Sequence, residues 1–302
     1  MIYTVTLNPS VDYIVRLPSF EAGRVNRADY EAIVAGGKGI NVSVMLHHLG
    51  VESTALGFVA GFTGKEIQRL VREAGCHERF LPLHEGFSRI NVKMKTDTES
   101  EINGAGPVIP KASLDALMTM LDDLQEGDIL VLSGSVPKSV PRTIYRDMAA
   151  RLEKKGVMIA ADASGELLTD ILPYSPFLIK PNHHELGELF GLEIDTAEEA
   201  ILYAKKLQAM GARNVLVSMA SKGAVLISEK GSVHTAHAPK GILVNSVGAG
   251  DSMVAGFLAG YMEHASYEKA FQMGVCTGSA SAFSEELATK DEVLDLYEKI
   301  DI

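Results

Sequence analysis

The stretch from Asn245 to Phe257 reads "NSVGAGDSMVAGF" and sets Gly248, Ala249 and Gly250 directly before the carboxylate of Asp251. A glycine-rich turn that enters a helix leaves backbone N–H groups without partners at the positive end of the helix dipole, which favours an anion. Two roles of the Asp251 carboxylate are consistent with this position. Asp is a favoured N-cap residue, and it could also act on an anion bound at the turn. The other motifs of the chain have to separate these roles.

Length, composition and charge limit the class of protein. The chain has 302 residues, of which 46% are hydrophobic and 22% charged, which is typical of a globular protein with a large core. Its formal net charge of -11 disfavours a broad nucleic-acid or anionic-membrane surface, which needs clustered Lys and Arg. We therefore expect a small-molecule ligand, no nucleic-acid partner and no membrane partner, with a local basic site for any anionic ligand.

The cysteines and the apolar runs bear on the compartment. Cys76 and Cys276 lie far apart and form neither a disulfide framework nor a zinc pattern. The N-terminal "MIYTVTLNPS" predicts a short strand and a turn rather than a signal peptide. No stretch approaches the roughly 18 apolar residues of a membrane span. These observations predict a soluble, cytoplasmic protein.

Strand-like apolar runs alternate with longer segments of helical period along the chain. The runs are "DILVLSG", "VMIAAD", "PFLIKPN", "NVLVSM" and "AVLIS", and the helical segments include 111–124, 141–155 and 197–210. This alternation predicts an α/β protein with a mostly parallel sheet covered by helices on both faces. Ligands of such sheets bind beyond the carboxyl ends of the strands, so the loops after the apolar runs are the candidate sites.

Two segments, 11–34 and 87–106, have a period nearer two and predict a small antiparallel β-sheet inserted in a single domain that spans 1–302. In the second segment Arg89, Asn91, Lys93 and Lys95 share one face. Arg89 and Asn91 are candidates for contact with a ligand. Lys93 and Lys95 fit a solvated outer face equally well.

The stretch "AGGKGINVS", from Ala35 to Ser43, places glycines before a helix that we expect to begin near Asn41. Glycines let a backbone approach a substrate closely. Lys38 adds a cation to this loop, and Asn41 has a side chain that can bond a sugar hydroxyl. The chain contains neither a P-loop nor a dinucleotide fingerprint. Ordinary turn chemistry remains the alternative for this loop.

The stretch "LIKPNHHELGELF", from Leu178 to Phe190, is an apolar strand stopped by Pro181 and followed by a helix. Asn182 and Glu185 are three apart, which fits a capping box and also fits oxygen ligands that hold water around Mg²⁺. Adjacent residues point to different sides of a helix, so we interpret His183 and His184 as surface or structural residues. In "VSMASKGAVLIS", Val217 to Ser228, Lys222 and Gly223 lie at the tip of a turn that is either an ordinary hairpin or a nucleotide loop.

The order of the motifs "TLNPSVD", "GGKGINVS", "SRINVK", "SGSVP", "IKPNHHE", "VSMASKG" and "NSVGAGDSMVAGF" resembles the PfkB, or ribokinase-like, family of carbohydrate kinases over essentially the whole chain. Among its branches the chain is most similar to the 1-phosphofructokinases, and next to the tagatose-6-phosphate kinases. The resemblance implies a three-layer α/β/α domain with a β-sheet lid, the use of ATP and Mg²⁺, transfer of phosphate to fructose 1-phosphate, and a homodimer formed through the lid.

The resemblance also implies roles for residues of this sequence. Asp251 would be the catalytic base, and Gly248, Ala249 and Gly250 would present N–H groups to the transferred γ-phosphoryl group. The implied sugar-phosphate ligands are Asp12, Arg24, Gly37, Lys38, Asn41, Arg89 and Asn91, with Arg27 a further cation. The implied nucleotide ligands are Lys180, Asn182, Ser218, Ala220, Ser221, Lys222, Gly223 and Gly250. Glu185, with Asn182, would organise Mg²⁺ through water.

The position of Asp251 at a helix N-terminus predicts a lowered pKa, and a weak base suffices because phosphoryl transfer depends mostly on positioning and charge stabilisation. Two departures from the family pattern, "NSV" before "GAGD" and Ala220 in the nucleotide loop, bear on nucleotide preference. Tagatose 6-phosphate or fructose 6-phosphate are alternative acceptors. A sugar-phosphate sensor without turnover is the non-enzymatic alternative, but it would predict loss of Asp251, Gly250 or Glu185, and all three are present.

Overall fold

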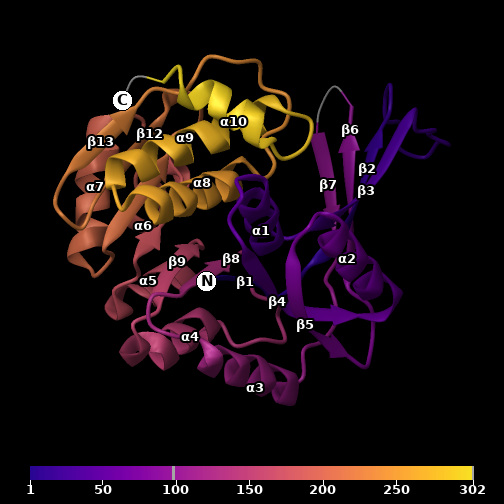
Figure 1. The fold of residues 1–302 in the computed structure, drawn as a ribbon. Helices are drawn as coiled ribbons and strands as arrows, with labels where there is room; N and C mark the ends of the chain where they lie inside the picture. The colour runs from indigo at the N-terminus through magenta and orange to yellow at the C-terminus, as the bar shows by residue number, and fades with distance from the viewer. Residues whose placement is uncertain (97–98, 301–302) are drawn as a thin grey trace.

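A large, mostly parallel sheet forms the centre of the molecule (Figure 1). The computed structural model describes residues 1–96 and 99–300. The strand order is β13 (Val233–Ala236), β12 (Ala224–Ile227), β11 (Asn214–Ser218), β10 (Leu178–Ile179), β9 (Met158–Asp162), β8 (Ile129–Ser133), β1 (Ile2–Thr6), β4 (Ser53–Ala60) and β5 (His77–Leu83). All neighbours from β11 to β5 pair in parallel, whereas β12 pairs antiparallel with both β11 and β13.

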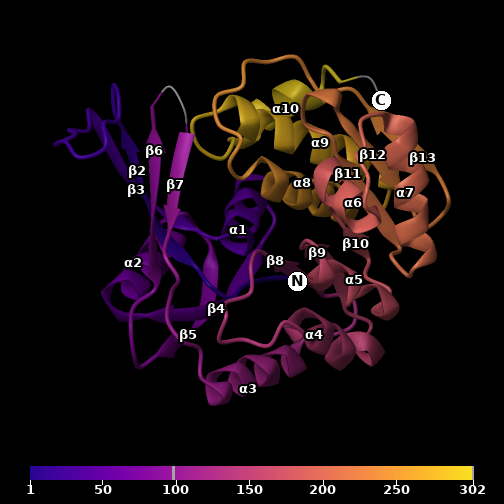
Figure 2. The same cartoon turned by 180° about the vertical axis from the view of Figure 1, so that it is seen from behind.

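Helices cover both faces of this sheet (Figures 1 and 2). One face packs against α1 (Lys38–His48), α8 (Ala249–His264), α9 (Tyr267–Phe283) and α10 (Lys290–Tyr297). The other packs against α3 (Lys111–Met120), α4 (Ile144–Leu152), α5 (Glu166–Thr169), α6 (His183–Phe190) and α7 (Ala197–Ala209). Strand β8 shows why both faces are apolar: Ile129 and Val131 enter the first core, and Leu130 and Leu132 enter the second. The predicted α/β/α class is confirmed.

The helix α2 (Gly61–Glu73) makes a third, smaller core beside β4 and β5, with Ile67 and Val71 packed near Val59 and Phe80. The predicted helical segments are present as α3, α4 and α7, two of them extended by short 3₁₀ turns at Leu121–Asp123 and Glu153–Lys155. Further 3₁₀ turns occupy Leu172–Tyr174 and Ala220–Lys222, the second at the tip of the β11–β12 connection.

A second sheet stands apart from the main one, beside α1 and α2 (Figure 1). Its order is β3 (Tyr30–Gly36), β2 (Ser10–Arg16), β6 (Arg89–Lys95) and β7 (Glu99–Asn103). The prediction of a wholly antiparallel sheet is wrong, because β2 and β6 pair in parallel. Strand β2 follows β1 and β6 follows β5, and both leave the carboxyl edge of one parallel sheet, so they run in the same direction. The sheet therefore projects over that edge, where ligands are expected.

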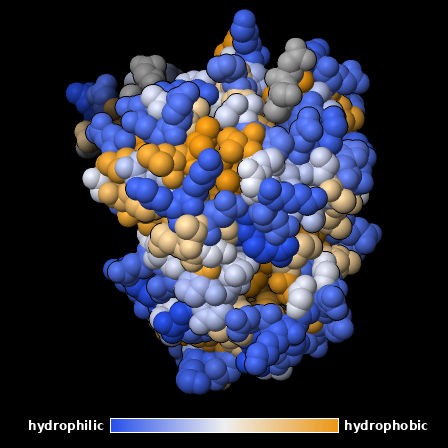
Figure 3. Space-filling model, turned by 90° about the vertical axis from the view of Figure 1, so that its left-hand side faces the viewer, coloured by the Kyte–Doolittle hydropathy of each residue, from blue (hydrophilic) through white to orange (hydrophobic). Residues whose placement is uncertain are grey.

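One face of the molecule is largely polar. Figure 3 shows the face at the left of Figure 1 as mostly hydrophilic, with hydrophobic atoms gathered mainly in its upper half. Exposed apolar side chains include Ile242 and Leu243 in the loop before α8. Among the described residues there is no helix of the length and apolarity needed to cross a membrane.

Candidate active site

Asp251 lies in the first turn of α8 and is only 4% exposed. The N-cap position is Gly248, at a φ of 81°, a left-handed conformation that glycine adopts without strain. Asp251 does not cap the helix, because it is the third residue of α8 and no side chain makes a cap hydrogen bond there. Its Oδ2 instead accepts a hydrogen bond of 2.8 Å from Nδ2 of Asn41 in α1. Of the two roles open to Asp251 in the sequence, the structure therefore removes that of a simple N-cap.

Two lysines and a buried aspartate lie beside Asp251. Asp162, at the end of β9, is 2% exposed and pairs with Nζ of Lys38 at 3.0 Å and with Nζ of Lys180 at 3.3 Å. Burial alone raises the pKa of Asp162, but Lys180 and Lys38 together hold that pKa below its ordinary value. Burial lowers the pKa of Lys38. The carboxylates of Asp162, Asp251 and Glu185 together raise this pKa by more than burial lowers it, so the net shift is upward. Lys38 is therefore a permanent cation.

The electrostatic environment of Asp251 contradicts one prediction. Burial, followed by the charge of Asp162, raises the pKa of Asp251 to about 7, against the smaller opposing effects of Lys38, Asn41 and Lys180. The expected lowering by the helix N-terminus is wrong because removal from water outweighs the helix dipole. A carboxyl group that titrates near pH 7 is well matched to general base catalysis at that pH.

The loop before α1 also differs from expectation. The helix begins at Lys38 rather than near Asn41, with Gly37 as its N-cap at a φ of 131°. Lys38 is thus fixed in the first helical turn, where it reaches Asp162, and Asn41 lies one turn later facing Asp251. Gly36 has a separate role, since a Cβ there would come within 2.3 Å of Oδ1 of Asp12. Only glycine allows this close approach of β3 to the Asp12 carboxylate.

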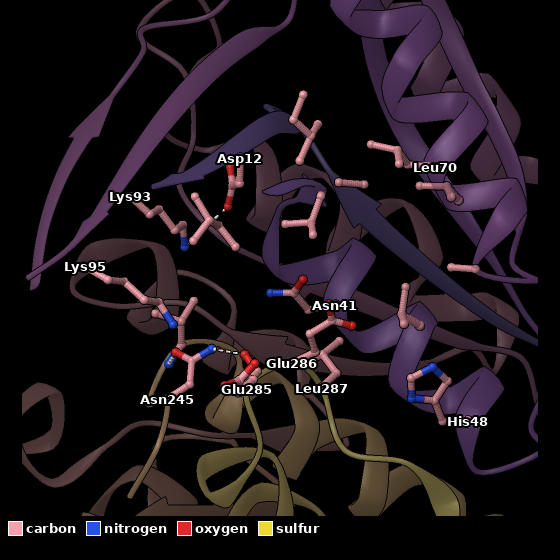
Figure 4. Close-up of a pocket in the computed structure, with 18 of the residues that line it drawn as sticks. Asp12, Asn41, His48, Leu70, Lys93, Lys95, Asn245, Glu285, Glu286 and Leu287 are labelled. Carbon is pink, nitrogen blue, oxygen red and sulfur yellow. Dashed lines mark hydrogen bonds and ion pairs between the residues drawn. The ribbon is translucent and has the colours of Figure 1, made fainter. Parts of the chain in front are cut away.

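A cavity of about 380 Å³ lies between the small sheet, α1 and the segment 285–287 (Figure 4). We call it the small-sheet cavity. Asp12 and Lys93 line it from the small sheet, and Asn41 lines it from α1. Nδ2 of Asn91 donates to Oδ1 of Asp12 at 2.9 Å, and Nζ of Lys93 lies 3.3 Å from Oδ2 of Asp12. The Asp12 carboxylate is thereby held in place within the cavity wall.

The two lysines of β6 settle a choice that the sequence left open. Lys93 is 9% exposed, and both Lys93 and Lys95 line the small-sheet cavity (Figure 4). Neither belongs to a solvated outer face. Facing them across the cavity are Glu285 and Glu286 from the loop before α10.

The predicted arginines lie elsewhere. Nε of Arg89 donates to the backbone carbonyl of Asn8 at 2.9 Å. Arg89 is not among the described residues that line the small-sheet cavity. Burial lowers the pKa of Arg89, which nonetheless stays charged. Arg24 is exposed in the β2–β3 connection and pairs with Glu21 at 3.2 Å, and Arg27 is exposed in the same connection. Within this one chain the arginines and Lys38 do not form a single cluster.

A larger cavity of about 970 Å³ lies beside α6, α8 and α9, and we call it the α6 cavity. Its lining contains both polar and apolar side chains. Six predicted nucleotide ligands belong to the lining: Asn182, Ser218, Ala220, Ser221, Gly223 and Gly250. His183, His184 and Lys240 also line it, as do the apolar Leu243, Met253, Val275, Ala282 and Phe283. A mixed lining of this kind suits a ligand that has both an apolar part and a polar or charged part.

Two predicted nucleotide ligands are not in this lining. Lys222 is exposed and its Nζ pairs with Asp195 at 2.7 Å, so the ammonium group already has a partner in another loop. Lys180 is buried in the pair with Asp162, although its Nζ would lie 3.2 Å from a Cβ built on Gly250. Lys180 is therefore directly behind the wall that Gly250 contributes.

Asn182 and Glu185 form the capping box that the sequence offered as the structural alternative. Oδ1 of Asn182 accepts from the N–H of Glu185, and Oε2 of Glu185 accepts from the N–H of Asn182, both at 2.8 Å. The box uses one carboxylate oxygen of Glu185 and leaves Oε1 outside it. Among the described residues, no three or more His, Cys, Asp or Glu side chains are grouped as a direct metal site.

Several residues at the two cavities were not chosen as candidates from the sequence: Gly36, Asp162, His183 and Lys240, whereas the role of Lys93 and Lys95 was left open. Asp162 had a signal, since it ends the strand-like run "VMIAAD" at the carboxyl edge of the sheet. Lys93 and Lys95 share the face of Asn91, which was itself chosen as a candidate. His183 and Lys240 had no local signal, because only the tertiary fold brings them to one cavity.

Comparison with known proteins identifies the family. A model described as pfkB family carbohydrate kinase matches residues 5–293. The chain belongs to this family. A 1-phosphofructokinase of Bacillus subtilis (strain 168) is 50% identical over 302 residues, covering 100% of this chain and 99% of the relative. A D-tagatose-1-phosphate kinase of Bacillus licheniformis is 35% identical over 288 residues, covering 95% of this chain and 94% of the relative.

The same relationship appears among solved structures. The phosphofructokinase-2 of Escherichia coli in complex with fructose-6-phosphate has a TM-score of 0.92 and 27% identity, covering 99% of this chain and 98% of that chain. The chain is thus a PfkB sugar kinase with the ribokinase-like fold, and the predicted family and fold are confirmed. The tagatose kinase among these relatives is named for the 1-phosphate, whereas the sequence-based alternative was a 6-phosphate kinase.

Proposed function

We propose that this PfkB kinase transfers the γ-phosphoryl group of ATP to fructose 1-phosphate and forms fructose 1,6-bisphosphate. The observation that carries the proposal is that Asp251 is linked to residues of both cavities. Ala249 and Gly250, its neighbours in α8, line the α6 cavity, whereas its hydrogen-bond partner Asn41 lines the small-sheet cavity. A donor nucleotide in the first and an acceptor sugar in the second would meet at Asp251.

The residues of the chain have distinct tasks in this transfer. Asp251 accepts the proton of the attacking sugar hydroxyl, and Asn41 keeps the carboxylate oriented toward it. Lys38, held by Asp162, supplies positive charge next to Asp251. The backbone N–H groups at Gly248, Ala249 and Gly250 face the group in transfer at the start of α8. Positioning and charge stabilisation of this kind carry most of the catalysis in phosphoryl transfer.

The donor set fits a magnesium ion held mainly through water. Glu185 keeps Oε1 outside its capping box and lies near enough to Lys38 to affect its pKa. Mg²⁺ retains several waters and needs few carboxylates, so Glu185 and Asn182 would suffice to orient it. When bound, the ion would neutralise charge on the nucleotide phosphates. Asp162 is unsuited to a direct role because both its oxygens face lysines.

The acceptor would lie in the small-sheet cavity. Asp12 and Asn41 would bind sugar hydroxyls, with Gly37 beside them, and Asn91 would hold Asp12 in place. Lys93 and Lys95 provide positive charge within the cavity wall for the phosphate already on the sugar. Arg24, Lys38 and Arg89 stay proposed phosphate ligands, and Arg24 and Arg89 would have to move from their present partners. Lys180, Ser218, Ala220, Ser221, Lys222 and Gly223 stay proposed nucleotide ligands.

A second acceptor, D-tagatose 1-phosphate, is favoured by the 35% identity to the kinase named for it. The test is the initial rate of ADP formation with MgATP and each of fructose 1-phosphate, tagatose 1-phosphate, tagatose 6-phosphate and fructose 6-phosphate, compared as kcat/KM. We expect fructose 1-phosphate to give the highest value. A preference for another sugar would overturn the acceptor, and no ADP formation with any sugar would favour the sensor without turnover.

The small sheet would act as a lid and as a dimer interface. Tyr13 pairs in register with Ile33 and Val92, and Val92 with Ile102, so these side chains form one row across the sheet. Ile33 is 51% exposed and Ile102 is 60% exposed in the single chain, which leaves apolar area for a second copy to cover. Ile102→Asp should shift the mass measured by light scattering toward a monomer. A cytoplasmic location remains part of the proposal.

A further inference from the structure

A row of three buried polar side chains lies at the carboxyl edge of the main sheet, beside the start of α1. Thr6 ends β1, Ser133 ends β8 and Asp162 ends β9, and these strands are neighbours in the sheet. The three residues are 4%, 1% and 2% exposed. Within the part of the chain that the structure describes, Oγ1 of Thr6, Oγ of Ser133 and Oδ1 of Asp162 have no hydrogen-bond partner. Such buried polar atoms cost free energy and are rare in folded proteins.

The register of the strands brings these side chains together. Ser133 pairs with Asp162, and Thr6 lies beside Ser133 because the residues before them are also paired. Side chains alternate between two faces along a strand, and all three lie on the face that α1 covers. Neighbouring strands are about 4.8 Å apart, so rotation about one side-chain bond brings a hydroxyl within reach of the next strand. The backbone of Ser133 is held, since Tyr145 donates a hydrogen bond of 3.0 Å to its carbonyl.

The charge of Asp162 is balanced by two lysines that also lie next to the proposed site of phosphoryl transfer. Oδ2 of Asp162 accepts from Nζ of Lys38 at 3.0 Å, and Nζ of Lys180 lies 3.3 Å from Oδ1. Lys38 lies beside Asp251, and Nζ of Lys180 would be 3.2 Å from a Cβ on Gly250. An anionic phosphoryl group at this place would attract both lysines. Asp162 would then lose part of its compensation while buried, which is unfavourable.

We propose that Ser133 and Thr6 are positioning residues, which supply hydrogen bonds to Asp162 while the two lysines bind the phosphoryl group in transfer. A hydroxyl both donates and accepts, so Thr6 donates to Oγ of Ser133, and Ser133 donates to Oδ1 of Asp162. Each bond in such a chain polarises the next. This inference rests on the proposed use of ATP. Neither hydroxyl residue is among the described residues that line the two cavities, so both act through Asp162.

The test compares kcat, both KM values and the midpoint of thermal unfolding in three variants. Ser133→Ala should lower kcat about tenfold, because a hydrogen bond to a charged group is lost, and should keep both KM values within about twofold of wild type. Its midpoint should not fall, because the lost hydroxyl has no partner among the described residues. Thr6→Val keeps the shape of the side chain and should lower kcat about threefold. Thr6→Ser keeps the hydroxyl and should retain the wild-type kcat.

A double variant and a matched control separate this role from a structural one. Ser133→Ala combined with Thr6→Val should be no slower than Ser133→Ala alone, because Thr6 acts only through Ser133. The control is Thr4→Val, on the same strand and the same face, where the hydroxyl lies 2.8 Å from that of Ser43. This variant should lower the midpoint of thermal unfolding and leave kcat unchanged.

Three results would contradict the proposed hydrogen bonds to Asp162. An unchanged kcat in Ser133→Ala would overturn them. A lower midpoint in Ser133→Ala, like that of Thr4→Val, would also overturn them, since the hydroxyl would then have a partner before nucleotide binds. Independent effects of Ser133→Ala and Thr6→Val on kcat would overturn the chain. If wild type accepts another sugar phosphate, the comparison uses that sugar and only the proposed acceptor fails. If no sugar phosphate gives ADP, the proposed function and this inference both fail.

Discussion

Replacing Asp251 by Asn tests catalysis and electrostatics in one variant. The substitution keeps the size of the side chain and an oxygen that can accept from Asn41, so the fold should persist. A general base contributes about 10² to 10⁴ in rate, and turnover should fall by that factor. The wild-type rate should also decline on the acidic side with a midpoint near pH 7, because Asp251 must be ionised to accept the proton.

Although Asp251→Asn should lose turnover, it should gain stability relative to wild type. Burial and Asp162 raise the pKa of Asp251 from 3.8 to about 7, so the folded state binds the proton more tightly than the unfolded state. This contribution is favourable below pH 3.8 and is lost as the pH rises through about 7. At about pH 8.5 the ionised carboxylate then weakens folding by on the order of 4 kcal/mol. Asp251→Asn should be more stable than wild type by an amount of that order at about pH 8.5, and by about 2 kcal/mol at about pH 5.

The assays are steady-state rates with saturating MgATP and urea unfolding at both pH values. Asp122→Asn is the matched control, because Asp122 is an exposed aspartate whose pKa is lowered by its hydrogen bond to Arg151. It should leave turnover unchanged and should not stabilise the protein at high pH. If Asp251→Asn keeps turnover within about threefold of wild type and shows no pH-dependent gain in stability, the assigned role and the assigned environment of Asp251 are both wrong.

Three further substitutions address the acceptor site and the charges around it. Gly36→Ala should raise the KM for the sugar phosphate by about tenfold or more with little effect on ATP affinity, because the new Cβ would displace the Asp12 carboxylate; an unchanged KM would show that Asp12 does not bind the sugar. Lys38→Met leaves buried Asp162 with Lys180 alone, and kcat should fall about 100-fold with a lower midpoint of thermal unfolding. A lower midpoint with an unchanged kcat would show that the charge of Lys38 does not take part in catalysis. Arg89→Ala should mainly raise the KM for the sugar phosphate, measured by initial rates, and an equal KM would mean that Arg89 only ties β6 to Asn8.

Local patterns were enough to predict the architecture. The alternation of apolar runs and helical segments predicted the parallel sheet and its two helical layers, because a strand such as β8 is apolar on both faces only when both are covered. The predicted antiparallel direction of β6 relative to β2 was wrong. The pairing of strands that lie far apart in the sequence depends on where each strand leaves the main sheet. The glycine loop was placed correctly, but the start of α1 was predicted near Asn41 and lies at Lys38.

The site was predicted less completely than the fold. Asp251, Asn41 and Asp12 were predicted because they lie in motifs whose residue types have a chemical use. The structure places Asp12 and Asn41 in the wall of the small-sheet cavity and joins Asp251 to Asn41, which leaves their roles as predictions. The pKa of Asp251 could not be predicted from its helix position, because it depends on Asp162 and on burial by distant segments. The ion pair of Lys222 could not be predicted for a similar reason, since its partner Asp195 lies in another loop.

Phosphorus-31 NMR of a reaction that contains the protein, MgATP and fructose 1-phosphate would decide whether the proposed transfer takes place. We predict that ADP and fructose 1,6-bisphosphate appear in equal amounts, with the new phosphorus signal on the C6 oxygen and no free phosphate. Conversion of ATP to ADP with free phosphate and no bisphosphate, or transfer only to a different sugar phosphate, would contradict the proposal.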